Sequence, residues 1–238
     1  MLARPSQPRA HTGNSRSAFG GRPVLCAVLD GAAFGEDPHG RALDFFEAGV
    51  DWIQLRDRNL EDFRLWQIAC ALLAARDDCD RVDPANAIRR VIVNKRSDLV
   101  WAVGADGVHL GFDALEQETS RAFLGSNALL GASLHSVAEV ESAAAGTIDY
   151  AHLAPIWDPL SKPATRPALG LGRLAAACGS GLPVLAQGGV DADHAGDAIR
   201  AGAAGVAVTG LLRSKSEACD AIRTLREGLD EGRRSAIG

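Results

Sequence analysis

The 238-residue chain has 47% hydrophobic and 23% charged residues, which is enough apolar material for one large folded domain and too much for a disordered protein. Its net charge of -5 excludes general nucleic-acid binding, because that function requires broad neutralisation of phosphates. The chain has no run of about 18 apolar residues, so no membrane-spanning helix is expected.

The first 22 residues differ in composition from the rest of the chain. They are rich in Ser, Arg, Gly and Pro, contain no acidic residue and lack the apolar core of a secretory signal. We expect residues 1–22 to be a disordered tail, with an organellar transit peptide as the alternative, residues 23–232 to be the folded domain and residues 233–238 to be a C-terminal tail. The five cysteines have neither close pairing nor metal-ligand spacing, which indicates reduced thiols and a cytoplasmic protein.

From residue 23 onward, short apolar runs alternate with longer helical patterns, as in parallel βαβ units. The expected strands are Val24–Leu29, Trp52–Arg56, Val91–Asn94, Gly107–Leu110, Leu129–Ser133, Tyr150–Leu153, Val184–Gln187 and Val206–Thr209. The expected helices between them include Leu60–Ala75, Val137–Ala145 and Ala192–Ala201.

A glycine recurs where a helical stretch passes into a strand, at Gly49, Gly104, Gly146 and Gly202. Glycine suits the left-handed residue that follows a helix, because it has no Cβ to clash there. Four copies of one joint and eight strands favour a single (β/α)₈ barrel, with an open doubly wound sheet as the alternative.

Two connecting segments depart from this regular pattern. The polar stretch Asp77–Arg90 breaks the helical period, so we expect a surface insertion at the non-catalytic end. The segment Ala154–Leu169 contains four prolines and is too long for a simple turn. Long βα loops of barrels usually carry function.

Active groups of such barrels lie at the C-terminal ends of the strands, and here those positions are basic or glycine-rich. They are Gln54, Arg56, Arg58, Asn94, Lys95, Ser133, His135, Ser161, Lys162, Gly188, Gly189, Thr209 and Gly210. The two glycine turns after the last two strands are suited to cradling a phosphate with backbone N–H groups. Arg56, Arg58, Lys95 and Lys162 are suited to a second anion site, although Arg56 has Asp57 as an alternative partner.

The histidines fall into three groups. His109 and His135 end strands and are candidates for acid/base chemistry, with a structural role as the alternative. Ser133 is expected to share a strand face with His135, which favours His135 for the chemical role. His152 is expected to be structural, and His11, His39 and His194 are expected to be solvated. Gly170-Leu-Gly172 is rejected as a dinucleotide motif, because it follows a loop and has no third glycine.

The chain resembles the thiamine-phosphate synthase family, whose branches include the thiazole tautomerases. The matching blocks are IQLRDR (Ile53–Arg58), VNKRSDLVWAVGADGVHLG (Val93–Gly111), GASLHS (Gly131–Ser136), APIWDPLSKPATRPALG (Ala154–Gly170), VLAQGGV (Val184–Val190) and AGAAGVAVTGLL (Ala201–Leu212). The resemblance implies a (β/α)₈ barrel that condenses hydroxymethylpyrimidine diphosphate with thiazole phosphate and releases pyrophosphate. It assigns the pyrimidine diphosphate to Gln54, Arg56, Arg58, Asn94, Ser133 and Lys162, and the thiazole phosphate to Ser161, Gly188, Val208 and Thr209.

The chain departs from this family at the expected metal ligands. Resembling synthases have two magnesium-binding aspartates at the positions of Lys95 and Ala114, and Phe112 stands where a glutamine is usual. Asp113 is the one carboxylate left nearby in the sequence, and it is the alternative candidate for a metal ligand in an unusual geometry. Because Mg²⁺ requires oxygen ligands, we do not expect a conventional magnesium site, and we expect Lys95 to neutralise the diphosphate directly.

Three hypotheses therefore remain, all with phosphorylated small molecules as ligands. The first is a transferase of the synthase type with Ser133, His135 and Lys162 at its catalytic centre. The second is a thiazole tautomerase that moves a proton through His135 and needs no metal. The third is a non-catalytic barrel that binds a phosphorylated ligand. The sequence leaves the oligomeric state open, with a homodimer as one expectation.

Overall fold

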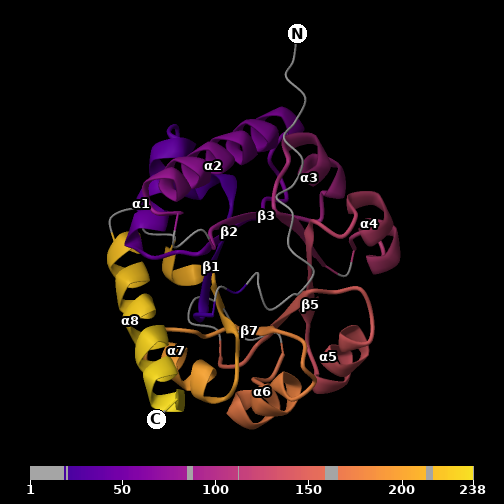
Figure 1. Ribbon diagram of the computed structural model, residues 1–238, viewed down its shortest axis with the longest axis vertical. Coiled ribbons are helices and arrows are strands. Elements are labelled where there is room, and N and C mark those ends of the chain that lie inside the picture. Colours follow the sequence, from indigo (N-terminus) through magenta and orange to yellow (C-terminus); the bar gives the residue numbers. More distant parts are fainter. Residues whose placement is uncertain are drawn as a thin grey trace.

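The strands lie in the centre of the molecule and the helices form an outer ring around them (Figure 1). The computed structural model describes residues 19, 21–84, 88–111, 113–158, 166–212 and 217–237. Within these ranges the strands close into one parallel barrel, in the order β1-β2-β3-β4-β5-β6-β7-β8, with β1 paired to β8. The predicted (β/α)₈ fold is confirmed and the open-sheet alternative is excluded.

The strands are β1 (Val24–Leu29), β2 (Trp52–Leu55), β3 (Arg90–Asn94), β4 (Gly107–Leu110), β5 (Leu129–Leu134), β6 (Tyr150–Leu153), β7 (Val184–Gln187) and β8 (Gly205–Val208). The helices are α1 (Pro38–Ala48), α2 (Asp62–Val82), α3 (Ser97–Val103), α4 (Gln117–Leu124), α5 (Val137–Ala144), α6 (Gly170–Cys178), α7 (Ala192–Arg200) and α8 (Ala218–Ile237). Two single-turn 3₁₀ helices, η2 (Gly31–Ala33) and η4 (Gly210–Leu212), follow β1 and β8. Among the described residues, no helix has the length and hydropathy needed to cross a membrane.

Two apolar layers follow from the alternation of side chains along each strand. The outer layer fills the space between the strands and the helices and includes Leu25, Ile53 and Val208. The inner layer fills the barrel itself and includes Cys26, Trp52 and Tyr150. Residues that continue the inward-facing series past the strand ends therefore face the mouth of the barrel.

Buried Asp–Arg pairs hold the opposite, N-terminal end of the barrel together. Asp51, Asp106 and Asp149 directly precede β2, β4 and β6, and each accepts a backbone N–H from the start of the preceding strand, at 2.7–2.8 Å. Each carboxylate also pairs with arginine: Asp51 with Arg22 and Arg226, Asp106 with Arg76, and Asp149 with Arg121. Asp51 and Asp106 are fully buried, so these pairs also neutralise charges that water does not reach.

The folded part of the chain extends into both predicted tails. Phe19 is 7% exposed, packs on Trp52 with ring centroids 5.2 Å apart and belongs to the inner layer, so the barrel includes residues before 23. At the other end, α8 continues past residue 232 to Ile237. Gly232 does not end the helix, because it lies against Gly196 of α7, where a Cβ would come within 2.7 Å of the Gly196 Cα.

Two further expectations about connections also need correction. The first part of the stretch that begins at Asp77 is not an insertion, because α2 continues through Val82. The buried side chain of Asp80 pairs with Arg89. Three joint glycines, Gly49, Gly104 and Gly202, have positive φ as predicted. Gly146 is not among them, because α5 ends with Ala145 in a right-handed conformation and one extra residue separates the joint from β6.

Candidate active site

Two amide side chains, buried Gln54 and half-buried Asn94, lie near the ends of β2 and β3. The Gln54 Nε2 donates to the Asn94 Oδ1 at 3.1 Å. Gln54 is 2% exposed, and its Oε1 has no hydrogen-bond partner among the described residues. An unpaired acceptor at this depth is costly unless a ligand donates to it. The pair therefore presents one orphaned acceptor to a ligand, as expected of a binding position.

Two arginines follow β2, the strand that carries Gln54. Arg56 is half-buried and Arg58 is exposed, and neither guanidinium has an ion-pair partner within the described ranges. Burial and, after it, repulsion from Arg58 lower the pKa of Arg56. Their mutual repulsion favours the binding of an anion between them.

Asp57 is not the partner of Arg56, so that alternative is wrong. Its Oδ1 accepts from Asn59 N and Leu60 N, and its Oδ2 accepts from Gly31 N, each at 2.9 Å. Burial acts to raise the pKa of Asp57, but these backbone hydrogen bonds outweigh burial and hold the pKa below its usual value. The carboxylate thus fixes the loop after β2 and leaves the arginines for another anion.

Lys95 follows β3 in an unusual backbone conformation, with φ of 64°, the left-handed region. Its N–H donates to the His109 carbonyl at 2.9 Å, and its ammonium pairs with Asp113. The hydrogen bond from Lys95 is the main cause that lowers the pKa of Asp113, and Arg58 contributes. Lys95, Arg56, Arg58 and Asp113 therefore form one mixed cluster with an excess of positive charge, which we call the cationic cluster.

These residues do not fit a magnesium site. The Lys95 ammonium lies against the one carboxylate of the cationic cluster, and Ala114 offers only a methyl group. Across the described part of the chain, no three His, Cys, Asp or Glu side chains come together as metal ligands. A hard divalent cation needs several oxygen ligands, and an ammonium group repels it.

Ser133 lies near the end of β5, which pairs with β4. Its Oγ is 2.9 Å from His109 Nε2, and the Nδ1 of the same ring is 3.2 Å from the Tyr150 hydroxyl. Burial, and after it the charge of Arg56, lower the pKa of His109 to about 3. The buried, hydrogen-bonded ring and this lowered pKa favour the structural role of His109 over the acid/base role.

His135 is held by two hydrogen bonds at the same end of β5. Its backbone N–H donates to Glu139 Oε2 at 2.7 Å, and its Nδ1 lies 2.8 Å from the Ala154 carbonyl oxygen. Because a carbonyl only accepts, Nδ1 carries the proton in this bond and the neutral ring keeps a lone pair on Nε2. His135 is half-buried and can accept a proton through that atom.

The glycine turn after β7 packs against the segment that follows β6. Gly188 and Gly189 have φ of 89° and 65°, and a Cβ on Gly188 would come within 2.8 Å of Pro155. Trp157 N donates to the Gly188 carbonyl at 3.0 Å. The close packing of this segment therefore requires glycine here independently of any ligand, while the Gly188 and Gly189 N–H groups have no acceptor among the described residues.

Thr209 and Val208 complete this side of the mouth. β8 ends at Val208, one residue earlier than expected. Thr209 directly follows the strand and is half-buried. The Val208 side chain packs in the outer layer, so only its backbone is available to a ligand. The predicted residues Ser161 and Lys162 lie outside the described residues, as do Phe112 and His11.

The contacts of two rings near the site, those of His194 and Tyr150, are not predicted by the sequence. His194 is half-buried and so only partly solvated: its ring stacks on Trp157 with centroids 4.4 Å apart, and its Nδ1 bonds the Gly189 carbonyl at 2.9 Å. The sequence places Tyr150 in a strand and indicates no role for it. The alternation of Tyr150 and His152 along β6 would have placed both inside the barrel. His39, also expected to be solvated, is half-buried and pairs with Asp78 at 2.9 Å.

Comparisons with known proteins identify the family of the chain. The family model TMP-TENI, described as thiamine monophosphate synthase, matches residues 25–212. A thiamine-phosphate synthase of Mycolicibacterium paratuberculosis is 40% identical over 168 residues, covering 67% of this chain and 73% of its own length. One of Methanoculleus marisnigri is 38% identical over 180 residues, covering 75% and 82%.

Solved structures give the same fold. The thiamine phosphate pyrophosphorylase of Pyrococcus furiosus superposes with a TM-score of 0.73 at 23% identity, covering 88% of this chain and 96% of its own. The family match spans most of the barrel, including β2, β3, β5, β7 and β8, which carry the described site residues. This chain is therefore a member of the thiamine monophosphate synthase family.

Proposed function

We propose that this protein is a thiamine-phosphate synthase, a transferase that joins hydroxymethylpyrimidine diphosphate to thiazole phosphate. In that reaction the bond between the pyrimidine methylene carbon and the diphosphate oxygen breaks, the thiazole nitrogen bonds to that carbon, and pyrophosphate leaves. The observation that carries the proposal is the cationic cluster, which lies beside the orphaned acceptor of Gln54 at one barrel mouth.

The cationic cluster suits the pyrimidine diphosphate. Arg56, Arg58 and Lys95 would neutralise the diphosphate, and they would stabilise the charge that grows on pyrophosphate as it leaves. Asn94 and Ser133 would donate hydrogen bonds, and the Gln54 Oε1 would accept one from a polar ring substituent. Lys162 is proposed to join them from the loop after β6.

The thiazole phosphate is assigned to the other side of the mouth. The Gly188 and Gly189 N–H groups, the Val208 backbone and the Thr209 hydroxyl offer the donors that a phosphate needs, with Ser161 proposed as a further one. β7 and β8 are neighbours, and β8 pairs with β1 next to β2, so the two anion positions share one mouth.

A thiazole tautomerase is the second candidate, and the geometry of His135 favours it. Its Nδ1 is engaged by the Ala154 carbonyl, which leaves Nε2 as a base, and the reaction would need neither a diphosphate site nor a metal. Three cations around Gln54 and Asn94 would have no substrate charge to bind in that reaction, so the synthase is preferred.

One pair of assays decides between the candidates. With both synthase substrates and a chelator, we expect thiamine phosphate, with turnover lost in Arg56→Ala and retained in the distant surface variant Arg223→Ala. The carboxylated thiazole phosphate is offered separately. Tautomerisation that is lost in His135→Asn, together with no condensation, would replace the synthase by the isomerase. No turnover of either kind, with tight binding of a phosphorylated ligand, would leave a binding protein.

Assembly and location remain predictions. Homodimer formation is tested by sedimentation at several protein concentrations, and cytoplasmic location by fractionation of the source cells. Phosphorylated small molecules are the proposed partners.

A further inference from the structure

A chain of three polar side chains runs from the centre of the barrel to its mouth. The Tyr150 hydroxyl lies 3.2 Å from His109 Nδ1, and the other ring nitrogen, Nε2, lies 2.9 Å from Ser133 Oγ. Tyr150 and His109 are 0% and 1% exposed, whereas Ser133 is only half-buried. The chain therefore begins in the dry interior and ends where a ligand can reach it.

Packing fixes the buried end of this chain. The Tyr150 ring lies across Gly131, where any Cβ would clash with the ring and its hydroxyl. Trp52 packs edge-on against the same ring, with centroids 5.0 Å apart and an interplanar angle of 76°. The Tyr150 hydroxyl is thus held at the His109 ring.

Counting protons along the chain selects one arrangement. Burial raises the pKa of Tyr150, so its hydroxyl keeps its proton, and its one acceptor among the described residues is His109 Nδ1. A neutral imidazole has one N–H, so when Nδ1 accepts, Nε2 donates to Ser133 Oγ. In the opposite tautomer the buried tyrosine proton would have no acceptor, which is unfavourable.

This arrangement determines what Ser133 can offer. Because its oxygen already accepts from His109, its own proton is free for a ligand acceptor at the mouth. We propose that Tyr150 and His109 are positioning residues that hold Ser133 as a hydrogen-bond donor to an oxyanion of the substrate. That this oxyanion is the diphosphate rests on the proposed function. The tautomer of His109 rests only on its hydrogen bonds to Tyr150 and Ser133.

The first experiment measures the tautomer in the free protein. Histidines are labelled with ¹⁵N, and the His109 signals are identified as those missing from His109→Gln. We expect a protonated Nε2 and a bare Nδ1. In Tyr150→Phe, which removes the hydroxyl alone, this preference should be lost. Cys26→Ala, which alters the same inner layer but removes neither hydrogen bond of the chain, should leave the tautomer unchanged.

The second experiment measures binding of pyrophosphate by calorimetry. Ser133→Ala should weaken binding about 10-fold or more, the range for a hydrogen bond to a charged acceptor. Tyr150→Phe should weaken it about two- to fivefold, because only part of the population then presents the donor. In the Ser133→Ala background, Tyr150→Phe should have no further effect. A general packing defect would instead weaken binding in both backgrounds.

Each result decides a separate point. A protonated Nδ1 in the unmutated protein would overturn the positioning role, and so would an equal effect of Tyr150→Phe in both backgrounds. The expected tautomer without any pyrophosphate binding would overturn the diphosphate site of the proposed function while the tautomer assignment stands. Unchanged melting temperature of Tyr150→Phe by circular dichroism shows that the variant is folded.

Discussion

Lys95 occupies a backbone conformation that disfavours any residue with a Cβ, and strain of this kind costs roughly 1–3 kcal/mol. The strain is maintained by two backbone bonds, Lys95 N to the His109 carbonyl and Ser97 N to the Lys95 carbonyl. It aims the ammonium at the mouth, against Asp113. At this position the side chain can exchange its carboxylate partner for a phosphate oxygen, which makes Asp113 a competitor of the substrate.

This competition gives a test at the residue scale. Lys95→Ala should weaken pyrophosphate binding about 10-fold, because a charge-assisted hydrogen bond is lost. Asp113→Asn, which has nearly the same shape, should strengthen binding, since it releases the lysine. Titration calorimetry at two salt concentrations measures both.

The metal question is tested on the same residue. We expect turnover of the unmutated protein to persist in chelator, and Lys95→Asp to be inactive unless a divalent cation is added. Turnover that chelator abolishes in the unmutated protein would refute the role of Lys95 as the diphosphate counter-charge.

At the scale of elements, the sequence predicted strands better than helix ends. Val24–Leu29, Gly107–Leu110, Tyr150–Leu153 and Val184–Gln187 match the structure residue for residue, because short apolar runs between glycine joints have little freedom of register. The end of α2 could not be predicted in the same way. Its last turns are polar, and they are helical because Cys79 and Asp80 are buried and Asp80 pairs with Arg89, a contact from outside the helix.

The candidate site shows the same division. Strand ends could be ranked by position alone, which found Gln54, Arg56, Asn94 and Ser133. The structure was needed to show that His109 is buried and neutral, since burial depends on the closed barrel and not on local pattern. Tyr150 became visible as a partner only when β4 and β6 were placed across the same interior.

The contact between α7 and α8 depends on small residues, and it can be tested with glycine substitutions. A Cβ on Gly228 would come within 2.6 Å of the Ala192 carbonyl, and one on Gly232 within 2.7 Å of Gly196. Gly232→Ala should therefore lower the free energy of unfolding by about 1–3 kcal/mol, despite the better helix propensity of alanine. Gly172→Ala in α6, where a Cβ meets nothing within 4 Å, should raise it by about 0.5–1 kcal/mol. Urea denaturation compares the two, and equal shifts would contradict this account of the α7–α8 contact.

At the scale of the whole molecule, two buried histidines make stability depend on pH. Burial lowers the pKa of His109 to about 3, and burial followed by the neighbouring His109 lowers that of His152 well below 6.5. In the unfolded chain both accept a proton near pH 6.5. Between that pH and the folded pKa, the unfolded state binds more protons, so the free energy of unfolding falls as pH falls below about 6.5 and is full above it.

The expected slope is roughly 1.4 kcal/mol per pH unit for each histidine. Urea denaturation at pH 7.5, 6 and 5 measures it. His152→Gln should reduce the slope by about half in the acidic range. A slope that is the same in His152→Gln would show that carboxylates alone govern the acid response.

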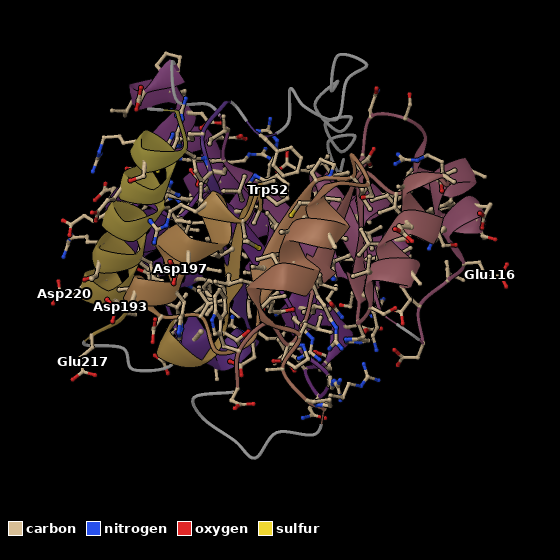
Figure 2. The ribbon with its side chains drawn as sticks, turned by 90° about the horizontal axis from the view of Figure 1, so that it is seen from below. Trp52, Glu116, Asp193, Asp197, Glu217 and Asp220 are labelled. Carbon is tan, nitrogen blue, oxygen red and sulfur yellow. The ribbon has the colours of Figure 1, made fainter. Side chains whose placement is uncertain are left out.

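The charges of the molecule are distributed differently over its two ends and its flanks. Figure 2 shows Trp52 toward one end of the barrel, with the acidic side chains Asp193, Glu217 and Asp220 on the outer α7–α8 flank at the other. The cationic cluster, after β2, β3 and β4, is thus a local exception in a chain of net charge -5. Anions are attracted there by neighbouring groups and not by the overall field.

Each aspartate that precedes β2, β4 or β6 binds the start of the preceding strand. At the N-terminal end of the barrel the strands are therefore joined in the pairs β1–β2, β3–β4 and β5–β6. Before β8 the corresponding residue is Ala204, so the fourth pair of strands, β7 and β8, is joined at this rim by the backbone, with Ala204 N donating to the Val184 carbonyl at 2.8 Å. Three pairs of strands are therefore linked by a carboxylate, and the fourth has an alanine in its place. We expect opening of the barrel to begin between β7 and β8.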